Sequence, residues 1–160
     1  MSSLMLLDLS NNFLSGTIPD QIGKLNNLTL FSVMFNQMSG SVPNSISDLH
    51  NLITLVIWNN SFTGILPQAL GRNSALQWLD VSSNSFTGPI PPMLCRGGNL
   101  TKVILFNNHF SGPIPGSLAN CPSLWRVIIQ NNQLSGAIPV GFGMLPSLNR
   151  LELAKKKAKW

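Results

Sequence analysis

Charged residues are scarce in this sequence, and their scarcity excludes most kinds of catalysis. Only 9% of the 160 residues are charged. The five acidic residues are scattered, and the two histidines, His50 and His109, have no carboxylate at a spacing that would pair with them. The sequence contains no cluster of metal ligands, no phosphate-binding loop and no nucleophile motif. We therefore expect no enzyme, no catalytic residue, no metal and no cofactor.

The net charge of +5 is concentrated at one end of the chain. Residues 1–154 carry six basic and five acidic side chains, and the four remaining basic residues are Lys155, Lys156, Lys157 and Lys159. The body of the chain is therefore almost neutral. Since no basic stripe runs along it, we expect no nucleic-acid partner.

Long apolar runs are also missing. No stretch approaches the ~18–20 apolar residues needed to cross a bilayer. The opening MSSLMLLDLS lacks the basic region of a signal peptide. We expect this chain to contain neither a signal peptide nor a transmembrane segment, to make no direct membrane contact, and to be a piece of a longer protein.

Repetition, by contrast, is abundant. An asparagine, a glycine and a proline recur together six times, and each series advances by 24 residues without a slip. The series are Asn12, Asn36, Asn60, Asn84, Asn108 and Asn132; Gly16, Gly40, Gly64, Gly88, Gly112 and Gly136; and Pro19, Pro43, Pro67, Pro91, Pro115 and Pro139. A fixed period of this length with the pattern LxxLxLxxNxL is the signature of leucine-rich repeats.

The period predicts an α/β solenoid. We expect a right-handed superhelix of leucine-rich coils with a parallel β-sheet on the concave side and short 3-10 or irregular segments on the convex side. Residues 1–3 are an N-terminal extension, and residues 148–160 are a partial seventh repeat that ends in the lysine-rich tail. The six complete repeats of region 4–147 are 4–27, 28–51, 52–75, 76–99, 100–123 and 124–147.

Each repeat position has a predicted role. Positions 3 to 8 read as a strand with positions 4 and 6 pointing inward and positions 3, 5, 7 and 8 pointing outward. The asparagine at position 9 is expected to bond the backbone of neighbouring coils. The glycine at position 13 permits a positive φ, and the proline at position 16 prevents an early α-helix. These repeated residues build the scaffold.

The amino-acid sequence of the repeats resembles that of a known repeat type. The phrase LSGxIPxxLGxL, across residues 4–153, resembles the plant-type leucine-rich repeat of receptor-like kinases, and WNNSFTGILPQALG (58–71) and PVGFG (139–143) resemble the ectodomains of the phloem-intercalated-with-xylem (PXY) group of CLE/TDIF peptide receptors. The resemblance implies an ectodomain on the extracellular side of the plasma membrane, in a single-pass parent protein. It also implies a secreted CLE-type peptide ligand on the concave surface, a co-receptor leucine-rich-repeat kinase, and kinase activity only in a domain absent from this chain.

Outward strand positions are free to vary without harming the core, so we expect the ligand there. Aromatic and charged side chains at these positions are typical anchors of binding surfaces, although aromatic residues also pack laterally between strands. The candidate ligand-binding residues are Met34, Phe35, Trp58, Trp78, Asp80, Lys102, Phe106, Arg126, Ile128 and Gln130.

Arg126 has a more specific expectation. In the resembling receptors an Arg-x-Arg pair on this strand is associated with the free C-terminal end of the peptide, and two guanidinium groups can hold one carboxylate. This chain has Ile128 at the second position. We expect weaker or altered recognition of that end, or a solvated strand charge at Arg126.

Two kinds of covalent modification are also candidates. Cys95 and Cys121 fall on adjacent coils about one strand spacing (~5 Å) apart, which allows either a disulfide in an oxidising compartment or two buried thiols. Asn27, Asn59 and Asn99 begin glycosylation sequons. Their number is close to the chance expectation, so they are no evidence of secretion.

Two other functions remain open at this point. One is a defence protein that binds a microbial enzyme, as polygalacturonase inhibitors of similar repeat type do. The other is a truncated, non-signalling receptor fragment, because Lys156 stands where the next repeat asparagine is expected. An enzyme inhibitor should present a broad charged patch, whereas a peptide groove should present a narrow track of aromatic residues and isolated charges.

Overall fold

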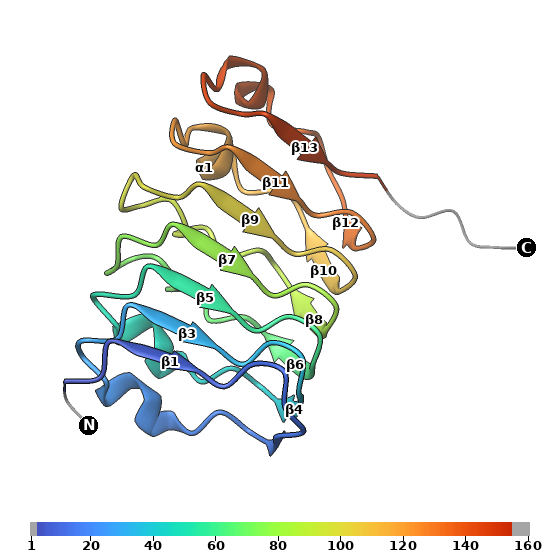
Figure 1. The fold of residues 1–160 in the computed structure, drawn as a ribbon. Helices are drawn as coiled ribbons and strands as arrows, with labels where there is room; N and C mark the ends of the chain where they lie inside the picture. The colour runs from blue at the N-terminus through green and yellow to red at the C-terminus, as the bar shows by residue number, and fades with distance from the viewer. Residues whose placement is uncertain (1–2, 155–160) are drawn as a thin grey trace, which may run out of the picture.

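The computed structural model describes residues 3–154, which form a regular stack of coils (Figure 1). The concave sheet has seven parallel strands in chain order: β1 (Leu6–Asp8), β3 (Leu30–Ser32), β5 (Thr54–Val56), β7 (Trp78–Asp80), β9 (Lys102–Ile104), β11 (Arg126–Ile128) and β13 (Arg150–Glu152). The predicted parallel-sheet solenoid is confirmed. The lysine-rich tail 155–160 and the first two residues of the predicted extension lie outside the described residues.

The predicted inward and outward phase of the strands is confirmed. Positions 4 and 6 of the inner coils, such as Leu79 and Val81, are fully buried members of the hydrophobic core. Position 5 points the other way: Val56, Ile104 and Ile128 are covered by neighbouring side chains but do not belong to that core. The strands themselves are shorter than expected, since they end at position 5 instead of position 8.

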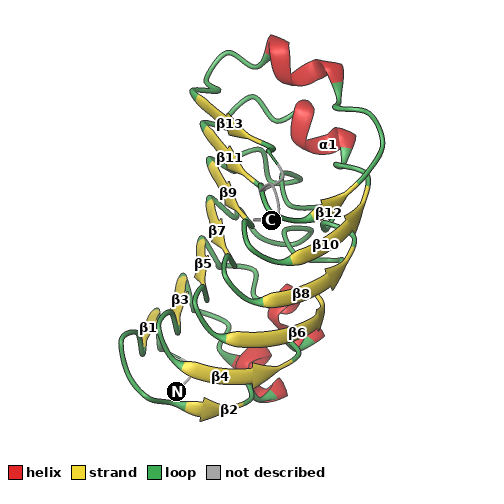
Figure 2. Ribbon diagram, turned by 90° about the vertical axis from the view of Figure 1, so that its right-hand side faces the viewer, coloured by secondary structure: helices red, strands yellow, loops and turns green. Residues whose placement is uncertain are grey.

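A second parallel sheet lies on another side of the stack and was not predicted (Figure 2). Its strands are β2 (Ser15–Gly16), β4 (Gln37–Gly40), β6 (Ser61–Ile65), β8 (Ser85–Gly88), β10 (His109–Gly112) and β12 (Gln133–Leu134). Serine, threonine and glycine in this phrase are typical of turns. Here the pairing comes from the neighbouring coil, as between Thr63 and Ser85, and is invisible to a local pattern.

Short helices occupy the far side of the coils, as predicted. They are η1 (Asp20–Lys24), η2 (Asn44–Asp48) and η3 (Val140–Met144), which are 3-10 helices, and the four-residue α1 (Gly116–Ala119). Each one follows a repeat proline, and the prolines before η1, η2 and α1 are in extended conformation, for example Pro43 with φ −68° and ψ 144°. Because proline fixes φ and has no N–H, it stands just before the first helical residue without losing a hydrogen bond.

The repeat asparagines bridge successive coils, which confirms their scaffold role. Asn84 is buried, and its Nδ2 donates to the carbonyl oxygen of Ile57 in the preceding coil at 3.2 Å and to that of Val81 at 3.1 Å. Its Oδ1 accepts the backbone N–H of Phe62, also in the preceding coil, at 3.0 Å. Buried backbone groups at this turn are thereby satisfied, and each coil is fastened to the one before it.

Apolar stacking completes the interface between coils. Phe62, Phe86 and Phe110 are fully buried, and their rings stack along the solenoid at centroid distances of 6.2 and 6.0 Å. The repeat glycine bends the chain beside them: Gly88 has φ +73°, and a Cβ there would lie 2.9 Å from Cγ1 of Ile65. Each coil therefore repeats one geometry, which places every outward position in a column.

Candidate functional site: the concave face

The outward residues form columns that run across the strands. Position 3 aligns Thr54, Trp78, Lys102, Arg126 and Arg150, and position 5 aligns Val56, Asp80, Ile104, Ile128 and Glu152. Parallel strands lie about 4.8 Å apart, so side chains in one column touch their neighbours. This arrangement brings five of the predicted residues into two clusters: Phe35 with Trp58, and Trp78 with Lys102 and Arg126. The other predicted residues lie outside these clusters.

The first cluster is an aromatic pair on the second and third coils. The rings of Phe35 and Trp58 meet edge to face with centroids 4.3 Å apart, and Phe35 keeps 42% of its surface exposed. Phe35 also has φ +53°, a left-handed conformation. That conformation costs a residue with a bulky side chain of order 1–2 kcal/mol. The predicted Met34 adjoins this pair in sequence and is partly exposed.

The same turn position is occupied by asparagine or serine in every other described coil. Asn11, Asn59, Ser83, Asn107 and Asn131 all have φ between 51° and 55°. Asparagine tolerates this conformation well because its short polar side chain can bond locally. The backbone conformation therefore does not explain why residue 35 is a phenylalanine. For this reason the Phe35–Trp58 pair is a candidate contact surface.

The second cluster is a cationic row on the fourth to sixth coils. Nζ of Lys102 lies 4.4 Å from the ring centroid of Trp78 and 5.9 Å from that of Trp125. Cζ of Arg126 lies 4.6 Å from the ring centroid of Trp125. Distances within about 6 Å are attractive cation–π contacts. Two predicted residues, Lys102 and Arg126, thus share a contact with Trp125, which the sequence reasoning missed.

Trp125 was missed because position 2 precedes the expected strand. Other coils place Met5, Thr29, Ile53, Gln77 and Thr101 at this position. A single large aromatic residue directly before an arginine, in line with a lysine one coil earlier, was the signal available in the sequence. Trp125 keeps 39% of its surface exposed, so it borders the concave face rather than the core.

The remaining predicted residues do not form a cluster. Asp80 and Ile128 face outward but are each only 8% exposed, because the adjacent columns cover them. Burial raises the pKa of the Asp80 carboxyl, against the opposing effect of hydrogen bonds from the Ser82 hydroxyl at 2.6 Å and the Ser82 N–H at 3.1 Å. Phe106 and Gln130 are partly exposed, and Ser82 stands between Phe106 and Trp58 in the position-7 column.

The structure joins Cys95 and Cys121 by a disulfide with the Cα atoms 6.0 Å apart. This separation lies inside the ordinary window for a disulfide. The bond connects two neighbouring coils on the side away from the concave sheet. It therefore fastens the scaffold and does not take part in the candidate site.

The three sequon asparagines are all exposed. Asn27 and Asn99 share position 24, at the loop that leads into a strand, and Nδ2 of Asn99 donates to the carbonyl oxygen of Gly97 at 3.1 Å. Asn59 follows Trp58 at the left-handed turn position. A glycan on Asn59 would therefore stand beside the aromatic pair.

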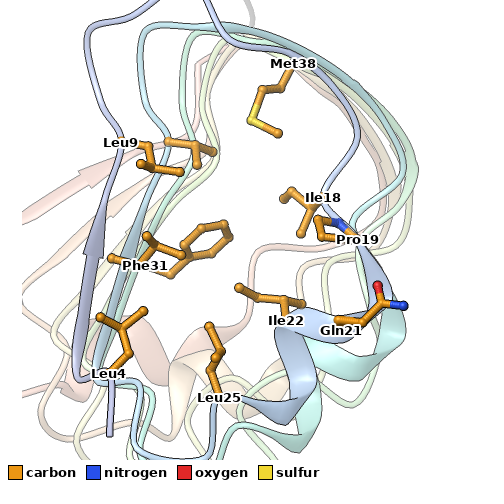
Figure 3. A pocket seen from close by; sticks show the side chains of 11 residues that line it. Leu4, Leu9, Ile18, Pro19, Gln21, Ile22, Leu25, Phe31 and Met38 are labelled. Carbon is orange, nitrogen blue, oxygen red and sulfur yellow. The ribbon is translucent and has the colours of Figure 1, made fainter. Parts of the chain in front are cut away.

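A cavity of about 350 Å³ opens at the outer side of the first coil (Figure 3). Leu9, Ile22 and Phe31 are among the apolar side chains that line it. These positions belong to the core: their counterparts in the inner coils are buried against the next coil. We interpret this cavity as the open end of the hydrophobic core and not as a ligand site.

Among residues 3–154, no group of three or more histidine, cysteine or acidic side chains could hold a metal ion. Over the same residues, no helix is both long and apolar enough to cross a bilayer.

The comparisons with known proteins agree with this geometry. The sequence profile of the family described as Leucine Rich Repeat matches residues 3–25, 51–73, 75–96 and 99–121, together more than half of the chain. A search of curated proteins found no significant match.

Three solved structures are informative. The structure of a TDR receptor has a TM-score of 0.94 and 52% identity over 97% of this chain. Arabidopsis HAESA, in complex with the peptide hormone IDA and the co-receptor SERK1, has a TM-score of 0.94 and 45% identity over 97%. The plant peptide hormone receptor RGFR1, in complex with RGF2, has a TM-score of 0.86 and 38% identity over 90%.

This chain covers only 27%, 26% and 23% of those three chains, respectively, which is about a quarter of their length. Among these similar structures, HAESA was also solved as a leucine-rich-repeat ectodomain. This chain is likewise a repeat segment and not a catalytic domain. The chain therefore belongs to the leucine-rich repeat family, and it resembles the ectodomains of plant receptor kinases.

Proposed function

We propose that this chain is a ligand-recognition segment of a plant receptor-kinase ectodomain and binds an extended peptide on its concave face. The observation that carries the proposal is the pair of clusters on the outward columns. A partly exposed aromatic pair, in which Phe35 has a left-handed conformation, and a row of cations packed on tryptophans do little for the core, but they are typical anchors of a binding surface. The peptide complexes of HAESA and RGFR1 support the same function.

The finer proposal is that the ligand is a secreted CLE-type peptide. It rests on the likeness to the TDR receptor and on Arg126, which we propose contacts the C-terminal end of the peptide. A co-receptor leucine-rich-repeat kinase is the second proposed partner, by analogy with SERK1 in the HAESA complex.

We also place the segment on the extracellular side of the plasma membrane, as part of a single-pass parent protein. A disulfide between neighbouring coils fits an oxidising compartment. The same location would allow glycans on Asn27, Asn59 and Asn99. Mass spectrometry of the secreted protein before and after glycosidase treatment would test each asparagine separately.

Isothermal titration of the folded chain with synthetic CLE-type peptides tests the proposal. Peptides of the same composition in scrambled order are the matched control. We expect saturable binding of at least one CLE-type peptide and none of its scrambled form. Equal heats for both, with circular dichroism showing folded protein, would overturn the peptide-binding function.

A further inference from the structure

Lys102 and Arg126 form a charge arrangement that folding alone does not explain. The two residues are register partners on the adjacent strands β9 and β11. Like charges that stand directly opposite on neighbouring strands repel each other and destabilise a sheet.

Among residues 3–154, no acidic side chain forms a salt bridge with this pair. Within residues 3–154, the salt bridge that is found joins Arg150 to Glu152, and neither Lys102 nor Arg126 takes part in it. The adjoining column contains Asp80, one coil from Lys102, and Glu152, one coil from Arg126. Asp80 is buried and accepts its hydrogen bonds from Ser82, and Glu152 is paired with Arg150. Two neighbouring cations on a partly exposed surface thus have no counter-ion among residues 3–154.

Indole rings position these cations. Trp125 contacts both of them, and Trp78 also contacts Lys102, so Lys102 lies near two indole rings. The Nε of Arg126 is buried and has no acceptor in the described part of the chain. The guanidinium group is therefore oriented by its packing on Trp125 and not by a hydrogen bond.

We infer that Trp125 is a positioning residue that holds Lys102 and Arg126 as a cross-strand cationic pair, and that this pair binds one carboxylate of the ligand. Lys102 supplies the second positive charge, because Ile128, on the same strand as Arg126, carries none. Lysine and arginine both donate charge-assisted hydrogen bonds to a carboxylate. The inference rests on the proposed function for the ligand's identity, but its chemistry can be tested without that ligand.

The test uses the folded chain and a minimal probe, N-acetylglycine, with its uncharged amide as the matched compound. Nuclear magnetic resonance follows the indole N–H of Trp125 and the Nε–H of Arg126 during titration. We expect saturable shifts with the acid and none with the amide. Substituting Trp125→Leu should weaken acid binding by about tenfold, which is the loss of two cation–π contacts.

Three further variants separate positioning from a general structural effect. Trp125→Phe retains an aromatic face and should restore binding to within about threefold of the original. Phe13→Leu removes an aromatic residue that is 88% exposed on the first coil and should change nothing. Lys102→Gln should weaken acid binding by about tenfold, because the carboxylate then meets only one charge.

Clear outcomes would overturn the inference. Equal shifts with acid and amide would show that the site does not recognise a carboxylate. Unchanged affinity in Lys102→Gln would show that Lys102 is not part of the binding pair. Unchanged affinity in Trp125→Leu would show that Trp125 does not position the cations. Failure of every CLE-type peptide while N-acetylglycine still binds would refute the proposed ligand and leave this inference standing. For a peptide that binds, amidation of its C-terminus and neutralisation of its acidic side chains identify which carboxylate occupies the pair.

Discussion

The two faces of the seven-stranded sheet are built from the same short strands, yet they follow different constraints. In the inner coils the inward positions are apolar and buried at nearly zero exposure, because each one packs against the coils on both sides. Outward positions change from coil to coil and include tryptophan, lysine, arginine and aspartate. The inner face therefore specifies the fold, and the outer face is free to specify a partner.

The largest expected effect is on the inner side of this comparison. Phe86→Ala removes a fully buried ring from the phenylalanine stack and should lower the free energy of unfolding by about 3–5 kcal/mol. Phe106→Ala is the matched control, since it makes the same change at an outward, partly exposed position and should cost well under half as much. Urea denaturation measures both, and equal losses would contradict the difference between the two faces.

The next effect concerns the asparagine that bridges coils. Asn84→Ala leaves the N–H of Phe62 and several buried carbonyls without their partner, and should lower the free energy of unfolding by about 2–4 kcal/mol. Asn26→Ala, at an exposed loop position, should change stability by less than about 0.5 kcal/mol. Similar denaturation midpoints for the two variants would show that the bridge contributes little.

A smaller effect on stability is expected from the outer aromatic pair. Trp58→Ala should cost about 1 kcal/mol through loss of the ring contact with Phe35 but weaken peptide binding by about tenfold. Its companion Phe35→Asn should be nearly neutral for folding, because asparagine suits the left-handed turn. Thermal melts and peptide titrations on the same samples measure both quantities. A large fall in melting temperature for Trp58→Ala would mean that the outer face also carries the fold.

The smallest expected effect depends on pH. Because the pKa of Asp80 is raised in the folded state, the folded protein binds a proton more tightly than the unfolded chain. Its charged form therefore destabilises the fold, and stability falls as pH rises from the usual aspartate range to the raised value. Asp80→Asn should melt higher than the parent at pH 7, and the gap should shrink as pH falls toward 3. A gap that is constant with pH would contradict this assignment.

Much of the fold could be predicted because the repeat removes ambiguity. Three series in phase located every coil, and the phase of the strands put Phe31 and Val33 inside, as the structure confirms. The second sheet could not be predicted, because Ser61 and Thr63 become strand residues only through pairing with other coils. The left-handed turn at position 8 was equally hidden, since Phe35 gives no local sign of it.

The outward columns of the candidate site could be predicted from the sequence, but the side-chain contacts between their residues could not. The outward positions of Trp58, Trp78, Lys102 and Arg126 followed from the alternation of the strand. The grouping of Lys102 with Arg126 did not, because it depends on Trp125, which lies outside the expected strand and contacts both side chains. The sequence also gave no sign that Asp80 and Ile128 would be covered by the columns beside them.

Because the coils are evenly spaced, the concave sheet fixes the distance between one binding position and the next. Each coil advances this face by about 4.8 Å, while each residue of an extended ligand advances by about 3.3 Å. The distance along the stack from the aromatic pair to Lys102 and Arg126 therefore selects how many ligand residues separate an apolar side chain from a carboxylate. Inserting one whole coil between the third and fourth coils would keep every type of inter-coil contact, yet would call for a longer ligand.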